Sequence, residues 1–157
     1  MAPDWPTAET YPGLMATSDL HDSDIREFLA TGTRTGHLGF LAADGRPLVA
    51  PIWFVLDGDR IAFNTGASTA KGRAVLRDPR VTLSVDLPSP PYGFVQIQGR
   101  AVVSEDLAEV RRIATLCGGR YMGADRADEF GARNGVPGEL VVWIEPALSL
   151  IHISEPT

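Results

Sequence analysis

The clearest pattern in the chain is the alternation of apolar and polar positions that is typical of β-strands. Residues 94–103 (FVQIQGRAVV) place small or branched apolar side chains on one face and longer, mostly polar ones on the other, which predicts a half-buried strand. The pairs Asp44-Gly45 and Asp57-Gly58 separate other apolar segments, and both pairs favour tight hairpins. The predicted strands are His37–Ala43, Pro47–Leu56, Arg60–Asn64, Val81–Asp86, Phe94–Val103 and Glu139–Glu145.

Other segments carry apolar residues at helical spacing. The first of these helices has candidate caps at Ser18-Asp19 and Asp22-Ser23 and ends at Gly32, a usual residue just beyond a helix end. The other predicted helices are Ala70–Arg77, Glu105–Cys117 and a looser segment, Arg120–Asn134. Six strands joined mostly by hairpins, with short helices at the corners, predict a mainly β fold with α additions (α+β), organised as a six-stranded β-barrel.

The length of 157 residues fits one domain with its own core, which we predict over residues 18–147. Residues 1–17 contain three prolines and no periodicity, so we expect a loose N-terminal arm. Residues 148–157 (LSLIHISEPT) do not continue the preceding pattern and read like the translation of a transposon-derived sequencing-library adapter. On this hypothesis the tail is not native, and an intact gene would encode a different sequence after residue 147.

Composition narrows the classes of function. The net charge of -6 at pH 7 argues against a nucleic-acid partner. Cys117 is the single cysteine, which excludes an internal disulfide and fits a reducing compartment. The most apolar stretch, Val49–Leu56, is far too short to span a bilayer, and the first residues do not resemble a signal peptide. No set of His, Cys and carboxylate side chains has metal-ligand spacing, so we expect no bound metal. We also expect a cytoplasmic location, with no membrane as a partner.

The stretch Asn64–Arg80 (NTGASTAKGRAVLRDPR) carries the most specific chemistry. A strand ends there, turns, and enters a helix that Ser68 or Thr69 can cap, and the free N–H groups of such a helix start favour an anion such as phosphate. Lys71 is a cation in the first turn, where it opposes the helix dipole unless a ligand anion is present. Gly72 would let the helix lie close to the sheet. Further basic groups follow at Arg73, Arg77 and Arg80, although a charged run on a short helix is also typical of a solvated face.

An ordered set of motifs resembles a known superfamily. The motifs are LGFLAADGRPLVAP with Ile52-Trp53, AKGR with RDPR, FVQIQGRAVV, and Arg120-Tyr121-Met122-Gly123. They are similar to the pyridoxamine 5'-phosphate oxidase-like split-barrel superfamily that binds FMN or F420, and most similar to its branch that uses the deazaflavin coenzyme F420. The resemblance covers residues 20–146. Members often have Asn-Leu where this chain has Ala74-Val75, and the Arg- and His-containing substrate segment of pyridoxamine-phosphate oxidases is absent, which argues against vitamin B6 oxidation.

The resemblance implies a homodimer of split barrels with the cofactor in the cleft between subunits. Lys71 and Arg73 would hold the phosphate and acidic tail, while Asn64 and Thr65 would lie along the ribityl chain and ring. The partner subunit would contribute from the loop Leu87–Tyr92 and from Trp143. The full set of predicted cofactor-binding residues is Ala50, Pro51, Ile52, Trp53, Asn64, Thr65, Ser68, Thr69, Ala70, Lys71, Gly72, Arg73, Arg77 and Pro88.

Three functions remain open from the sequence. The first is an F420-dependent oxidoreductase that transfers a hydride to a small electron-poor acceptor: a quinone, an enone, a biliverdin-like compound or a nitro compound. The second is an FMN-dependent oxidoreductase on the same fold, and the third is a non-catalytic cofactor- or haem-binding protein. No acid–base pair is evident, so the catalytic residues stay unassigned. Tyr92 and Tyr121 are candidate proton donors or packing residues, and Trp53 is either a core residue or a neighbour of the ring.

Overall fold

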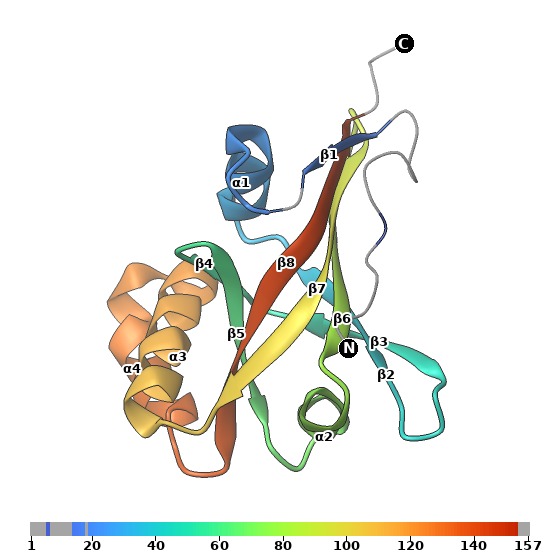
Figure 1. The fold of residues 1–157 in the computed structure, drawn as a ribbon. Helices are drawn as coiled ribbons and strands as arrows, with labels where there is room; N and C mark the ends of the chain where they lie inside the picture. The colour runs from blue at the N-terminus through green and yellow to red at the C-terminus, as the bar shows by residue number, and fades with distance from the viewer. Residues whose placement is uncertain (1–5, 7–13, 18, 154–157) are drawn as a thin grey trace.

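The fold is built on one continuous path of antiparallel strands (Figure 1). The computed structural model describes residues 6, 14–17 and 19–153. The strands are β1 (Met15–Thr17), β2 (Gly36–Leu41), β3 (Pro47–Ile52), β4 (Val55–Asp57), β5 (Arg60–Gly66), β6 (Arg80–Asp86), β7 (Gly93–Ser104) and β8 (Glu139–Ile153). The helices are α1 (Ser23–Ala30), α2 (Ala70–Arg77), α3 (Leu107–Met122), the 3₁₀ turn η2 (Ala124–Arg126) and α4 (Ala127–Asn134).

The strand order closes the sheet into a barrel. Neighbours along the path follow the order β3-β2-β6-β7-β8-β5-β4, and β1 pairs with β8 off this path. Its two ends, β3 and β4, are consecutive in the chain and are separated by Trp53 and Phe54 alone. The path therefore returns to its start and is split at these two residues. This confirms the predicted mainly β, α+β fold with a split barrel.

The strand count differs from the prediction, because the described residues form eight strands and not six. The predicted strand Pro47–Leu56 is two strands, β3 and β4, with a break at Trp53 and Phe54. The other additional strand is β1, which lies within the predicted N-terminal arm; most of that arm, residues 1–5 and 7–13, lies outside the described residues. Pro51, which lacks an N–H to donate, is on the edge strand β3, as expected for a proline in a sheet.

The apolar runs in β5 and β8 reflect burial on both faces. One face of these strands, with Phe63, Val142 and Ile144, joins the main core inside the barrel together with α1. The other face, with Ala62 and Val141, packs under α3 in a second apolar cluster. Figure 1 shows α3 and α4 side by side against the β4–β5 side of the barrel. Two-sided burial explains why ELVVWIE has no alternation. No helix among the described residues has the length and apolarity needed to cross a bilayer.

The last strand runs further than predicted. β8 continues beyond Glu145 to Ile153, and its final part pairs with the first half of β7, from Leu148 opposite Gln98 to Ile153 opposite Gly93. Leu148, Leu150 and Ile151 are buried. The segment from residue 148 onward thus takes part in the fold as far as Ile153, because backbone pairing accepts any extended chain with apolar residues at the right positions. Its adapter origin stays a prediction, and residues 154–157 lie outside the described part of the chain.

Ser149, within this last part of β8, is fully buried, and its hydroxyl is the buried side-chain polar group for which the described residues provide no hydrogen-bond partner. A buried hydroxyl without a partner loses its bond to water on folding and gains nothing in exchange. We therefore expect Ser149→Ala to raise the free energy of unfolding by about 1 kcal/mol, measured by urea denaturation. Ser84→Ala, at a half-buried position on β6, is the control. A loss of stability in Ser149→Ala would show that the hydroxyl has a favourable interaction.

Asp57, at the end of β4, connects the barrel to α3. Its carboxylate accepts two hydrogen bonds from the Arg112 guanidinium, at 3.0 and 2.8 Å, and one from the Trp143 indole N–H at 2.9 Å. The Arg112 hydrogen bonds, with a smaller contribution from Trp143, lower the pKa of Asp57 from 3.8 to about 2, against the opposing effect of burial. The charged form of Asp57 is therefore preferred in the folded state.

A carboxylate whose pKa is lowered by folding stabilises the protein above its unfolded pKa and loses that contribution as pH falls toward the folded value. We expect Asp57→Asn to lower the free energy of unfolding at neutral pH by about 1 kcal/mol, since solvent partly screens the ion pair. The difference from the wild type should shrink as pH falls from about 4 to about 2, because the wild-type carboxylate becomes protonated over that range. Urea unfolding across this range measures it, with Asp44→Asn, in an exposed ion pair with Arg46, as the control. A difference independent of pH would contradict the assignment.

Candidate functional site

A small cavity of about 220 Å³ lies where β3, β5 and α2 meet the α3–α4 pair. Half of its wall comes from residues that the sequence predicted to bind a cofactor, and the other half comes from α3 and α4. The lining residues are Pro51, Ile52, Trp53, Asn64, Lys71, Ala114, Cys117, Gly118, Phe130 and Asn134.

The start of α2 is held by a threonine network. Thr69 is the N-cap, and its hydroxyl accepts a hydrogen bond from the Gly72 N–H at 3.1 Å and donates to the Gly66 carbonyl at 2.8 Å. Thr65, which is buried, lies 3.0 Å from the same hydroxyl. Both threonine hydroxyls are therefore used to shape the turn, while Ser68 is exposed and makes no cap. The N–H groups of Ala70 and Lys71 lie ahead of the first intrahelical bond, as in any first turn.

Fewer basic side chains of the predicted patch are available to a ligand than the sequence indicated. Arg80 forms an ion pair with Asp78 at 2.7 Å, and this contact lowers the pKa of Asp78 to about 2. Arg77 donates to the Leu41 carbonyl at 3.2 Å. Lys71 and Arg73 have no ion-pair or hydrogen-bond partner among the residues that the structure describes. Lys71 is half-buried in the cavity wall, and Arg73 is exposed. The cations left for a ligand are therefore Lys71 and Arg73.

Asn64 lies in the cavity wall, but its side-chain amide NH₂ already donates hydrogen bonds within the protein. It donates to the Val110 carbonyl at 3.1 Å and to the Leu140 carbonyl at 3.4 Å, which joins α3 to β5 and β8. The carbonyl oxygen of this side chain is the group that can accept a hydrogen bond from a ligand. Ala50, half-buried on β3, immediately precedes the lining residues Pro51 and Ile52.

Sequence reasoning missed the wall formed by α3 and α4. Glycines make this wall close-packed: a Cβ at Gly118 would collide with the Phe130 side chain, and one at Gly131 with Thr115. The available signal was the run of small residues Cys117-Gly118-Gly119, at the end of the predicted helix Glu105–Cys117 and just beyond it. Cys117, also in this wall, is buried, and burial raises the pKa of its thiol to about 12. The thiol is therefore protonated at neutral pH and is not a nucleophile.

Two residues that the resemblance assigned to the partner's contribution do not line the small cavity of their own chain. Pro88, in the loop between β6 and β7, is exposed and does not line the small cavity. Trp143 is 6% exposed under α3, and its indole N–H is bonded to Asp57 of the same chain. The indole N–H of Trp143 is therefore already used within its own chain. Among the described residues no group of three or more His, Cys, Asp or Glu side chains is arranged to hold a metal.

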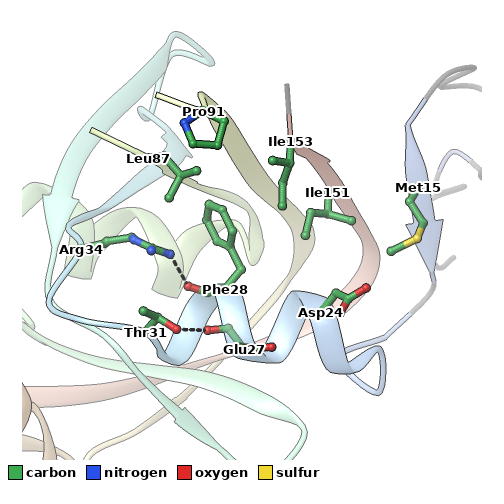
Figure 2. A pocket seen from close by; sticks show the side chains of 10 residues that line it. All are labelled: Met15, Asp24, Glu27, Phe28, Thr31, Arg34, Leu87, Pro91, Ile151 and Ile153. Atoms are coloured by element: carbon green, nitrogen blue, oxygen red, sulfur yellow. Dashed lines mark hydrogen bonds between the residues drawn. The ribbon is translucent and has the colours of Figure 1, made fainter. Parts of the chain in front are cut away.

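A larger cavity of about 600 Å³ lies beside α1 and the β6–β7 loop (Figure 2). Figure 2 shows Phe28 facing Leu87 and Pro91, while Ile151 and Ile153 form another part of the wall. These two isoleucines belong to the segment predicted to be adapter-derived, so the cavity depends on that segment. The smaller cavity is built without it and contains the free cation Lys71. We therefore place the candidate site at the smaller cavity.

The class of protein follows from the fold and the site together. The strand path is closed except at Trp53 and Phe54. Beside that opening, an aromatic wall faces a helix start whose cations have no partner among the described residues. This arrangement defines a split-barrel protein with a candidate binding cavity beside the split.

The comparisons with known proteins identify the family. A family model described as pyridoxamine 5'-phosphate oxidase matches residues 22–149. The chain belongs to this family, whose members bind flavins such as FMN. A search of curated proteins finds no match.

Solved structures include several with the same fold. An F420 reductase is 26% identical, with a TM-score of 0.60, over 78% of this chain and 94% of that chain. A conserved hypothetical protein from Mycobacterium tuberculosis has a TM-score of 0.72 at 20% identity, over 90% and 96% of the two chains. The haem storage protein HutZ from Vibrio cholerae has a TM-score of 0.65 at 16% identity, over 85% and 96%. The latter two similarities show the fold alone.

Gly72 provides a direct test of the geometry at the start of α2. A Cβ at this position would collide with the Gly66 carbonyl oxygen, because the helix lies directly against the end of β5. We expect Gly72→Ala to lower the free energy of unfolding by about 2 kcal/mol or more, since backbone on both sides prevents relaxation. Leu76→Ala, at an exposed position of the same helix, should have a much smaller effect. Equal stabilities of Gly72→Ala and the wild type in urea denaturation would contradict the close approach.

Proposed function

We propose that the protein is an F420-dependent oxidoreductase that acts as a homodimer, with the cofactor at the subunit interface. The observation that carries this proposal is the pairing of unpartnered cations with an aromatic wall. Lys71 and Arg73 stand at the start of α2 with no partner among the described residues, and Trp53, which is 42% exposed, faces the same cavity. The structural similarity to an F420 reductase at 26% identity supports the choice of cofactor.

The residues present fit an anionic cofactor with a planar ring. Lys71 and Arg73 would bind the phosphate and acidic tail, helped by the free N–H groups at the helix start. Ile52 and Trp53 would contact the ring, and the Asn64 carbonyl oxygen would accept a hydrogen bond from the polar chain between ring and phosphate. Reduced F420, when bound, supplies a hydride, which an acceptor with an electron-poor double bond, quinone or nitro group takes up together with a proton.

No side chain of the described residues is assigned as the proton donor. Burial raises the pKa of the Tyr121 phenol, and its hydroxyl donates to the Arg34 carbonyl at 2.8 Å, so its proton is already used within the protein. Tyr92 is exposed on the β6–β7 loop. In the proposed homodimer this loop, with Pro88, extends toward the partner's site, and the proton comes from solvent. The acceptor is a small quinone, enone, biliverdin-like compound or nitro compound.

FMN is the second candidate cofactor, because the family binds flavins and a phosphate dianion suits the same two cations. A haem-binding role is less well supported. No histidine, the commonest protein ligand of haem iron, lines the cavity as formed by the described residues, and the similarity to the haem storage protein shows only the fold.

The test is a fluorescence titration of the purified protein with F420 and, separately, with FMN. We expect tight binding of F420, weaker binding of FMN, and turnover of reduced F420 with at least one acceptor of the proposed classes. Lys71→Ala should weaken F420 binding about tenfold or more, since a hydrogen bond to a charged group contributes about 1.5–3 kcal/mol, and should leave the melting temperature nearly unchanged. Arg46→Ala removes a cation that is paired with Asp44 on another turn and serves as the control.

Each alternative result has a defined meaning. Binding of FMN alone would transfer the protein to the flavin-dependent branch. Binding of F420 without turnover on any acceptor would favour a non-catalytic carrier. Binding of neither cofactor, or equal F420 affinity in Lys71→Ala and the wild type, would contradict the proposed site.

A further inference from the structure

The break between β3 and β4 is held by side chains from a single helix. Trp53 and Phe54 lie outside both strands, so ladder bonds do not satisfy their backbone groups. The Phe54 N–H donates to the Tyr121 hydroxyl at 3.3 Å, and the Phe54 carbonyl accepts from the Arg120 guanidinium at 2.7 Å. The Cys117 thiol lies 4.0 Å from the Trp53 carbonyl. Positions 117, 120 and 121 share one face of α3, so this face covers the break.

The same two residues reach the end of α1. Arg120 donates to the Leu29 carbonyl at 2.6 Å and to the Gly32 carbonyl at 3.0 Å, and a cation is favourable at the negative end of a helix dipole. Tyr121 donates to the Arg34 carbonyl at 2.8 Å. The hydrogen bonds of the Arg120 guanidinium thus all go to backbone carbonyls. The exit of α1 and the strand break are fixed by one pair of neighbouring side chains.

The ring of Tyr121 also stacks on Trp53. The two rings are stacked, with centroids 5.0 Å apart and an interplanar angle of 3°, and Phe130 approaches the indole edgewise at 6.4 Å. Trp53 and its neighbour Ile52 line the candidate cofactor cavity, whereas Arg120 and Tyr121 do not. One face of the indole is therefore covered by Tyr121, and the indole stays 42% exposed.

We propose that Arg120 and Tyr121 are positioning residues for the cofactor cavity. They hold the break between β3 and β4, and through it the placement of Ile52 and Trp53, so that a planar ring meets a preorganised wall. Neither residue needs to touch the ligand. The identity of that ligand rests on the proposed function, but the effect on Trp53 does not.

The test uses a parent protein in which Trp53 is the only tryptophan, obtained with Trp5→Phe and Trp143→Phe; a cooperative melt confirms that it folds. In this parent, Tyr121→Phe removes the hydroxyl and keeps the ring, and Arg120→Met removes the three carbonyl contacts. We expect the F420 dissociation constant to rise about fivefold in Tyr121→Phe and more in Arg120→Met, since each hydrogen bond contributes about 1 kcal/mol. Tyr121→Leu, which removes the stacked ring, should shift Trp53 emission to longer wavelength and increase its quenching by acrylamide.

Arg112→Met is the matched control, because it also removes an arginine that ties α3 to the barrel, through Asp57. We expect this variant to lower the melting temperature while Trp53 emission and the F420 dissociation constant stay as in the parent. If the role of Arg120 were purely structural, Arg112→Met and Arg120→Met would both change the F420 dissociation constant and Trp53 emission, each in proportion to the stability that it loses. That result would overturn the proposal.

The two hypotheses fail in different ways. If the parent binds F420 and the Arg120 and Tyr121 variants bind it equally well, the positioning role is wrong and the proposed function stands. If the parent binds neither F420 nor FMN, the proposed function is wrong, and the emission and quenching of Trp53 alone decide the positioning role. Unchanged Trp53 emission and quenching in both Tyr121→Leu and Arg120→Met would then overturn it.

Discussion

A strand that ends its hydrogen-bond ladder inside a folded protein leaves backbone N–H and C=O groups that need other partners. Here that constraint falls on Trp53 and Phe54, where the strand path of the barrel would otherwise close. Helix α3 meets it with side chains and not with another strand. The barrel can stay split at this point because α3 is present, and the cavity lies beside the split. Fold and site therefore depend on the same set of contacts.

The positive charge of the candidate site comes from basic side chains that no described residue pairs with. The chain is acidic overall, and several of its arginines are used by carboxylates or carbonyls of the protein, as at Arg80 and Arg120. Lys71 and Arg73 are different, since no described residue neutralises them. Thr69 at the same time shapes the turn that brings the helix start to the end of β5. An anion at this position would balance both the cations and the helix dipole.

Much of the architecture could be predicted from local patterns, and the exceptions have physical causes. The bounds of α2 agree with the sequence because Thr69 and Asp78-Pro79 mark its ends chemically. The segment Pro47–Leu56 was predicted to be a single strand because its apolar run gives no local sign of a break. The break is stabilised by side chains that are distant in the sequence. The helix predicted to end at Cys117 continues to Met122, and Gly118 within it allows Phe130 to pack closely. The sequence placed five lining residues together but not the α3–α4 wall, since that wall depends on tertiary packing.

The contacts of Arg120 also bear on how the protein reaches its folded state. They join residues 66 and 91 positions apart in the chain, and contacts of such separation form late because a long loop must close first. A nascent chain that ends before α3 can pair β2 with β3 but has nothing to cover the break at Trp53. The cavity wall is therefore assembled only after three quarters or more of the sequence has emerged, so the proposed cofactor would bind only at the last stage of folding.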